Sequence, residues 1–145
     1  MERYQSSPNA YYIKEDVEER EYFIQKYVYS LKIRGLNVPK PVHYNKKTKQ
    51  LVMAKIHGMN ISDMYGDDIA NVPDKVFQKL RRIMKQLRQH EILYPDFTGY
   101  NFILDNNQER IWVIDFGHAS FCTEIDDPFV LSICEGEKHW NSEFQ

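Results

Sequence analysis

Three oxygen-bearing side chains, close together along the chain, could carry out phosphoryl transfer. Asp96 and Asn101 are five positions apart, and Asp115 follows the apolar run Ile111-Trp112-Val113-Ile114. A carboxylate can orient an attacking hydroxyl, while an amide and a second carboxylate can hold Mg²⁺ on transferable phosphates. Each residue taken alone reads as a turn or surface group. The three together, with a strand, a turn and a strand between them, predict phosphoryl transfer.

The residue patterns around this set predict the elements that position it. Residues 102–104 and 111–114 are apolar and flank a polar turn, which is typical of a hairpin. Residues 73–89 follow the helical period closely, and Pro73 suits the first turn of a helix that leads toward the Asp96 loop. A second short helix is expected around 128–134.

The first third of the chain predicts one strand and one helix. Residues 1–9 are polar and turn-rich, whereas residues 10–13 read as a strand that ends at Lys14. A helix is expected from 16 to 34, because this segment is acidic at its start and basic at its end, and Gly35 follows. Its apolar stripe contains Val17, Ile24, Val28 and Leu31, and Glu21 falls on the same stripe.

A second hairpin is expected between these two regions. Residues 42–44 and 51–56 form its strands, the polar turn 45–49 joins them, and Gly58 is expected to break the second strand. A rigid connector, Val38-Pro39-Lys40-Pro41, precedes it.

The spacing Asp-x-x-x-x-Asn, followed by a hairpin and then Ile114-Asp115-Phe116-Gly117, resembles the protein-kinase-like superfamily. The resemblance implies a minimal α+β kinase-like fold in a single domain, residues 1–145. A reduced N-terminal lobe would span 1–56, and a truncated, mainly helical C-terminal lobe would span 57–145. On this resemblance Asp96 is the catalytic carboxylate, and Asn101 and Asp115 are the metal ligands.

The same resemblance assigns roles to residues upstream. Lys14 looks like the strand lysine that holds the α- and β-phosphates of ATP, and Glu21 looks like the helix glutamate that fixes that lysine. Glu21 is the first candidate because an unpaired carboxylate within an apolar stripe would be costly. Glu18 is the alternative. The simpler interpretations, an exposed lysine and a glutamate favoured by the helix dipole, remain open.

The segment Leu51-Val52-Met53-Ala54-Lys55-Ile56-His57-Gly58 is similar to the strand and hinge between kinase lobes. The similarity implies that Met53 lines the back of an adenine pocket. It also implies that the backbone of Ala54 and Ile56 reads the adenine edge. A plain amphipathic strand is the simpler alternative. The implied cofactors are ATP and Mg²⁺, with Mn²⁺ as the alternative ion.

Several features depart from ordinary protein kinases. No glycine precedes Gly35, so the glycine-rich loop over the phosphates is absent, and the residues before Lys14 are too few for the usual two strands and loop. Tyr94-Pro95-Asp96 replaces His-Arg-Asp, and Thr98 replaces a lysine. This loop is more similar to that of RIO-type atypical kinases. Three motifs also resemble those of small kinase-like proteins of large DNA viruses: Tyr-Pro-Asp-Phe-Thr-Gly-Tyr-Asn-Phe at 94–102, Ile-Asp-Phe-Gly-His at 114–118, and Trp-Asn-x-Glu-Phe at 140–144.

The region after Gly117 also departs from the pattern, because only 28 residues follow and no Ala-Pro-Glu occurs. The helical subdomain that grips peptide substrates is therefore expected to be missing. Apolar residues near the end are expected either to fill its place or to meet a partner, namely Phe129, Val130, Ile133, Trp140 and Phe144.

Composition and net charge limit the kinds of partner and the cellular compartment that are expected for this chain. A net charge of −2 and a pI of about 6.2 give no electrostatic argument for nucleic acid or a membrane surface. No apolar run is long enough to span a bilayer, and no secretion signal is expected. Two cysteines without metal-type spacing favour a reducing, cytosol-like compartment, which would be the host cytosol or a virion for a viral protein.

The expected function is ATP- and Mg²⁺-dependent phosphoryl transfer to a serine or threonine of a protein substrate. Because the phosphates lack their usual cover, weak activity is expected, with gain from self-association or an activating protein. Two alternatives remain open. One is a pseudokinase that binds a partner, and the other is a small-molecule kinase resembling aminoglycoside or choline kinases, which Asp126-Asp127-Pro128 faintly suggests.

Overall fold

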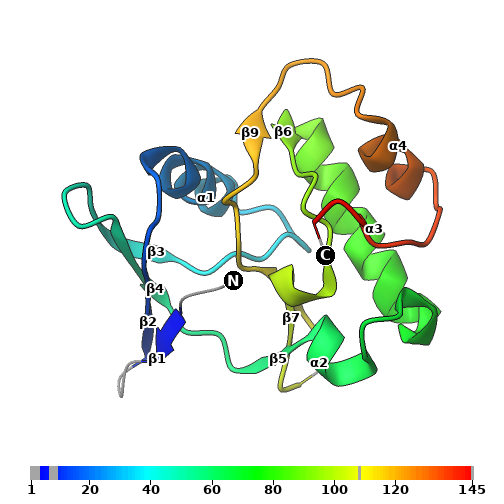
Figure 1. Cartoon of the computed structure of the whole chain (residues 1–145), viewed down its shortest axis with the longest axis horizontal. Coiled ribbons are helices and arrows are strands. Elements are labelled where there is room, and N and C mark those ends of the chain that lie inside the picture. Colours follow the sequence, from blue (N-terminus) through cyan, green and yellow to red (C-terminus); the bar gives the residue numbers. More distant parts are fainter. Residues whose placement is uncertain (1–3, 7–9, 108, 145) are drawn as a thin grey trace.

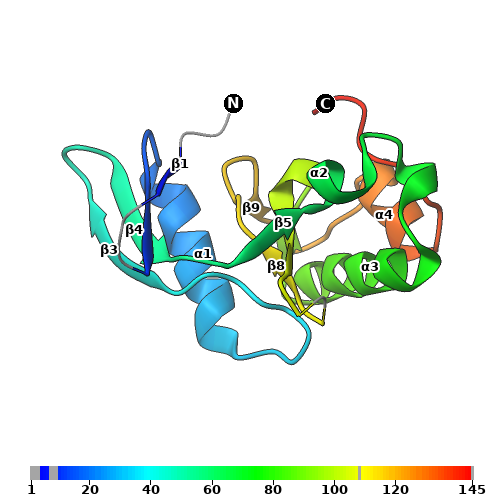
Figure 2. The same cartoon turned by 90° about the horizontal axis from the view of Figure 1, so that it is seen from below.

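A computed structural model of the chain describes residues 4–6, 10–107 and 109–144. Figures 1 and 2 show two parts. One holds a four-stranded sheet with a helix, α1, beside it, and the other holds the helices α3 and α4. A second, three-stranded sheet lies between them. The fold is therefore of the α+β class, as the sequence predicts.

The first sheet is antiparallel throughout, with strand order β1-β2-β4-β3. Its strands are β1 (Tyr4–Ser6), β2 (Tyr11–Lys14), β3 (Pro41–Asn45) and β4 (Gln50–Ala54). The register pairs Lys14 at the end of β2 with the buried Leu51 of β4. The predicted hairpin of β3 and β4 is confirmed. The sheet therefore holds Lys14 at the end of β2, where the residue is buried.

Strand β1 was not expected, because residues 1–9 read as turn-rich. It pairs with β2 in antiparallel register, so one strand does precede the lysine strand. The reason is tertiary: β2 has β4 on one side only, and β1 satisfies the backbone groups on its other edge. The residues that join β1 to β2 lie partly outside the described residues.

Helix α1 (Glu19–Leu31) is shorter than the predicted span 16–34. Asp16 has a positive φ of 57°, which is incompatible with a helix start, and Lys32 at 54° ends the helix. The buried residues of the helix are Glu21, Ile24, Gln25 and Val28. Glu21 therefore lies on the buried face, and Val17 is buried in the connector before the helix.

Gly58 does not simply break a strand. Strand β4 ends at Ala54, and Gly58 begins a new strand, β5 (Gly58–Asn60), which pairs with β7. A Cβ at Gly58 would lie 2.2 Å from the carbonyl oxygen of Leu104, so only glycine allows this close approach of backbones.

The second sheet carries the predicted hairpin near the site. Its order is β5-β7-β8, with β7 spanning Phe102–Asp105 and β8 spanning Ile111–Val113, paired antiparallel. A short helix, α2 (Ile61–Tyr65), and a 3₁₀ turn (Ile69–Asn71) follow β5 and were not predicted.

A second unexpected pairing joins β6 (Ile92–Leu93) to β9 (Ser120–Phe121). It ties the segment after Asp115 back to the segment before Asp96.

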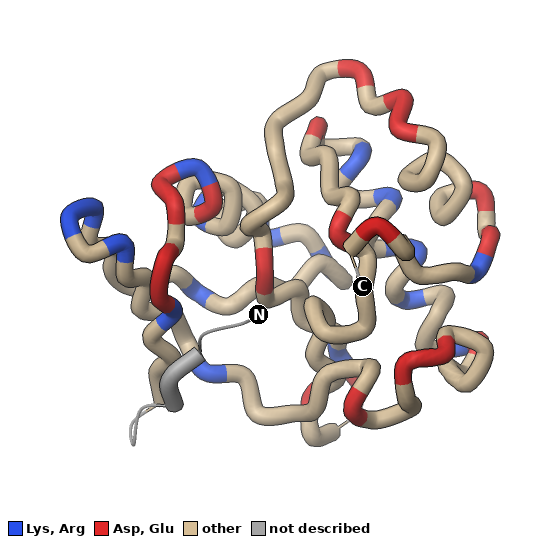
Figure 3. Tube along the Cα trace, in the orientation of Figure 1, with Lys and Arg blue, Asp and Glu red and all other residues tan. Residues whose placement is uncertain are grey.

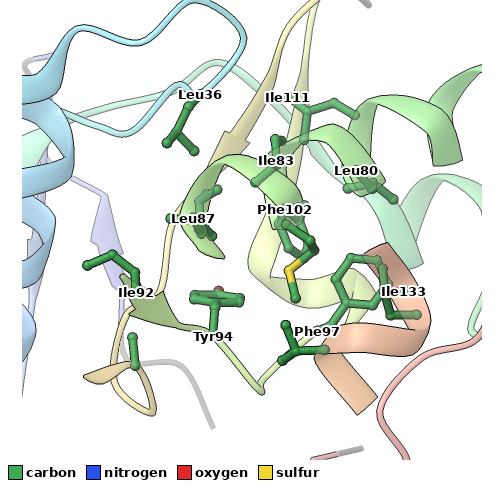
Figure 4. Close-up of a cluster of buried hydrophobic side chains, with 14 of the residues drawn as sticks. Leu36, Leu80, Ile83, Leu87, Ile92, Tyr94, Phe97, Phe102, Ile111 and Ile133 are labelled. Atoms are coloured by element: carbon green, nitrogen blue, oxygen red, sulfur yellow. The ribbon is translucent and has the colours of Figure 1, made fainter. Parts of the chain in front are cut away.

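Helix α3 (Asp74–Gln89) matches its prediction, and α4 (Pro128–Cys134) does as well. Figure 4 shows the core that they share with the second sheet. Val130, Ile133 and Trp140 are buried in this core, so these residues fill the expected gap. No helix among the described residues is long and apolar enough to cross a bilayer.

Candidate active site

Lys14 is shared by two carboxylates that come from different parts of the chain. Its Nζ lies 2.5 Å from Oε2 of Glu21 on α1 and 3.1 Å from Oδ1 of Asp115, after β8. The Lys14 and Glu21 side chains are only 8% and 6% exposed. Glu21 is buried and Asp115 is partly buried, and both share one ammonium. When both carboxyl groups are ionised the cluster has a net negative charge, which favours additional cations.

Glu21, and not Glu18, lies on Lys14. Glu18 instead pairs with the half-exposed Lys49 at 2.9 Å, so the two glutamates have separate partners. This difference arises at the start of α1. Glu18 is the extended residue just before the helix, whereas Glu21 lies in its first turn, on the buried face. The neighbouring Arg20 donates to the carbonyl of Gly117 at 3.0 Å. Helix α1 is thus attached to both the lysine strand and the turn after Asp115.

The Asp96 loop is fixed by its own backbone and by Asn101. Nδ2 of Asn101 donates to the carbonyl of Asp96 at 2.8 Å, and the backbone N–H of Ile114 donates to the Asn101 carbonyl at 3.0 Å. With its nitrogen engaged, the Asn101 amide has its oxygen left for a ligand. The Tyr94 hydroxyl donates to the Asp115 carbonyl at 2.6 Å. These bonds hold the Asp96 loop and the Asp115 turn against each other.

Gly99 is required in this loop by close packing. A Cβ there would lie 2.1 Å from Oγ of Ser62 on α2. The 3₁₀ turn Gly99–Asn101 therefore rests directly on α2. This contact gives the unexpected helix α2 a role in supporting Asn101.

Two groups that sequence reasoning did not assign also contact the Asp96 loop. Nδ1 of His118 lies 3.0 Å from Oδ2 of Asp96. Asn141 donates from its side chain to the Pro95 carbonyl at 2.7 Å and from its backbone to the Phe97 carbonyl at 3.0 Å. The only sequence signals were that His118 directly follows the Asp-Phe-Gly triplet and that aromatic residues flank Asn141.

All the predicted site residues line one cleft of about 1100 Å³ between the two parts of the molecule. They are Lys14, Glu21, Met53, Ala54, Ile56, Asp96, Asn101 and Asp115. Met53 is almost fully buried, lines the cleft and contacts Gln25. The N–H of Ala54 donates to the Lys40 carbonyl at 2.9 Å and is not available to a ligand.

The lining of the cleft is strongly acidic. Seven lining residues are carboxylates, whereas Lys14 is the one lysine among the described residues that line it. Figure 3 shows the acidic stretch that follows β2 in red. An anionic triphosphate can enter such a cleft only together with cations, because like charges at close range repel strongly.

A divalent ion fits the donors that converge here. Hard cations such as Mg²⁺ prefer oxygen ligands, which Asn101 and Asp115 supply. Among the described residues, no group of three or more histidine, cysteine, aspartate or glutamate side chains could hold a metal. Water or phosphate oxygens would complete the coordination shell.

The pKa of the Glu21 carboxyl is raised above its ordinary value of 4.5. Burial is the main cause, Lys14 opposes it, and Asp115 raises the pKa further. The folded state therefore holds this proton more tightly than the unfolded state does. The contribution of Glu21 to the free energy of unfolding is then greatest below pH 4.5 and is lost as the pH rises through the raised pKa.

Glu21→Gln should remove the part of the free energy of unfolding that falls as the pH rises through the pKa of Glu21. We expect the free energy of unfolding of Glu21→Gln, relative to that of the wild type, to increase as the pH rises above 4.5. Removing one of the two carboxylates that contact Lys14 shifts the whole curve, so the slope is the readout. Urea unfolding between pH 4 and 8, without metal, measures it. Glu18→Gln is the matched control for the loss of one carboxylate. A pH-independent difference would contradict the assignment.

The chain is similar to known proteins in sequence and in fold. The chain is 24% identical over 110 residues to the EKC/KEOPS complex subunit BUD32 of Enterocytozoon bieneusi (strain H348). The match covers 68% of this chain and 53% of the relative, so the chain spans about half the length of that curated relative.

The fold is also similar to a solved structure, that of the Cydia pomonella granulovirus kinase PK-1. The TM-score is 0.59 at 16% identity, and the match covers 88% of this chain and 60% of the other. At this identity the likeness concerns the fold alone. The RIO domain pattern matches residues 1–130, which contain every predicted site residue. The chain therefore belongs to the RIO domain family of atypical, kinase-like proteins.

Proposed function

We propose that this protein transfers the γ-phosphoryl group of ATP, with Mg²⁺, to a serine or threonine hydroxyl of a protein. The observation that carries the proposal is the convergence at Lys14. A lysine from the first sheet, a glutamate from α1 and an aspartate after β8 meet within 3.1 Å, in the same cleft as Asp96 and Asn101. A structural ion pair would not need a loop with a second carboxylate across the same cleft.

Each residue has a definite role in this proposal. Lys14, fixed by Glu21, would hold the α- and β-phosphates. Asn101 and Asp115 would hold Mg²⁺, which would neutralise charge on the phosphates. Asp96 orients the acceptor hydroxyl and accepts its proton. The hydroxyl oxygen forms a bond to the γ-phosphorus as the bond to the bridging oxygen breaks, and ADP leaves.

A small-molecule acceptor is less well supported. The Asp126-Asp127-Pro128 sequence suggested it, but Asp127 caps α4 by accepting from the N–H of Val130 at 3.0 Å. A helix cap explains this residue without any acceptor site.

We also propose that the protein works with a protein partner in a reducing compartment. The curated relative is named as a subunit of a complex, which supports a partner. The free thiols of Cys122 and Cys134 are in keeping with reducing conditions such as the cytosol.

Phosphate transfer and ligand stabilisation test the proposal together. Wild type should be stabilised against heat by ATP with Mg²⁺ and should transfer labelled γ-phosphate to protein serine or threonine, either on itself or on a generic basic protein. Lys14→Met should lose both effects. Lys46→Met, which removes a lysine that is 77% exposed, is the matched control.

The outcomes separate the candidate functions. Stabilisation without transfer to any acceptor would support a pseudokinase. Transfer to an aminoglycoside or to choline, but not to protein, would support a small-molecule kinase. The proposal is refuted if the wild type shows no stabilisation by ATP and no phosphate transfer.

A further inference from the structure

His118 contacts the proposed catalytic carboxylate directly. Its Nδ1 lies 3.0 Å from Oδ2 of Asp96, and the two side chains are 61% and 13% exposed, respectively. The proposed role of Asp96 as a base requires an ionised carboxylate, which can only accept, and Nδ1–H of the imidazole is then the donor. His118 is therefore the more exposed partner of this pair, and both side chains line the cleft.

The imidazole is itself held in place by the C-terminal segment. The ring of Phe144 packs on His118 with 5.0 Å between ring centroids. The same segment is bonded to the Asp96 loop through Asn141, which is buried, and Trp140 packs on Phe97 with 5.0 Å between ring centroids. His118 and Phe144 both line the cleft. The wall beside Asp96 is thus built from the turn after Asp115 and from this segment.

A hydrogen bond to Oδ2 fixes the rotation of the Asp96 carboxylate. Among the described residues, no hydrogen bond reaches the other oxygen, Oδ1, so it is left for an acceptor hydroxyl. Small errors in the orientation of a reacting group lower rates strongly, so a group that fixes this rotation contributes to catalysis without touching the phosphates.

We propose that His118 is a positioning residue for Asp96, and that His118 and Phe144 together form the acceptor-side wall of the cleft. This inference rests on the proposed function. It adds the residue that orients Asp96, which is His118. It also adds the two residues that would contact the protein segment carrying the hydroxyl, which are His118 and Phe144.

Steady-state kinetics of phosphate transfer test the positioning role. His118→Ala should lower kcat about tenfold, less than the 10²–10⁴ expected for loss of the base itself, and leave the KM for ATP unchanged. His118→Asn keeps a donor near Asp96 and should recover part of the rate. Phe144→Ala should raise the KM for the protein acceptor. His43→Ala, on exposed β3, is the control. A kcat of His118→Ala equal to that of the wild type would overturn the inference.

Nitrogen NMR of the imidazole gives a readout that does not depend on activity. His118 should carry its proton on Nδ1 in the wild type, and Asp96→Ala should remove this preference, because the acceptor is gone. An identical tautomer in both proteins would overturn the inference even if no transfer is observed. Absence of transfer in the wild type, with the tautomer change present, would refute the proposed function and leave the His118–Asp96 contact established.

Discussion

Asp96→Asn should lower the rate of phosphate transfer by about 10²–10⁴, the range typical for loss of a positioned base. The affinity for ATP should change little, because Asp96 is placed to face the acceptor rather than the phosphates. The substitution keeps the loop intact, since Asn101 donates to the backbone carbonyl of Asp96 and not to its side chain. Transfer assays together with ATP titration by thermal shift measure both quantities.

Asp126→Asn is the matched control for Asp96→Asn. It removes an exposed aspartate that lies in the loop before α4 and does not line the cleft. An Asp96→Asn protein that transfers phosphate as fast as the wild type would contradict the mechanism. Equal, near-zero rates in the wild type and in Asp96→Asn, with ATP still bound, would favour the pseudokinase alternative.

Asp115→Asn should abolish most of the Mg²⁺-dependent stabilisation by ATP. A ligand at a hundred times its Kd raises the free energy of unfolding by about 2.7 kcal/mol, so the loss is measurable as a change in Tm. Without ligand, the variant should remain folded. It removes one of the two carboxylates that share Lys14, while the amide oxygen can still accept from Gly117 at the position of Oδ1.

The design compares the Tm shift caused by ATP with and without Mg²⁺ in three proteins: wild type, Asp115→Asn and Asp126→Asn. The wild type and the Asp126→Asn control should respond alike. If Asp115→Asn shows the same Mg²⁺-dependent shift as the wild type, Asp115 is not a metal ligand, and the proposed role of the site in phosphate binding loses its basis.

The features that the sequence predicted well are those encoded over short distances. The hairpin of β7 and β8 brings Asn101 and Asp115 together because two apolar strands flank a polar turn, and pairing them is a local event. Helix α3 follows from a single apolar stripe with the helical period. These patterns need no knowledge of the rest of the chain, so residue types and spacing were enough.

Features that depend on contacts between distant segments could not be predicted in the same way. Strand β1 forms only because an edge of β2 is available, and Gly58 is needed only because β7 approaches it closely. Neither requirement leaves a periodic signal. A polar segment such as residues 1–9 is equally consistent with a turn, and a glycine such as Gly58 is equally consistent with the end of a strand.

The sequence by itself predicted a set of side chains for phosphoryl transfer, and it limited the expected partner of Lys14 to two glutamates. Only the tertiary structure placed Glu21 on Lys14 and directed Glu18 to Lys49, because the start of the helix depends on the backbone at Asp16. It also placed His118 on Asp96, through a turn and a terminal segment that meet only in the folded chain. Spacing along the chain encodes local geometry, whereas contacts across the cleft depend on how the two parts pack.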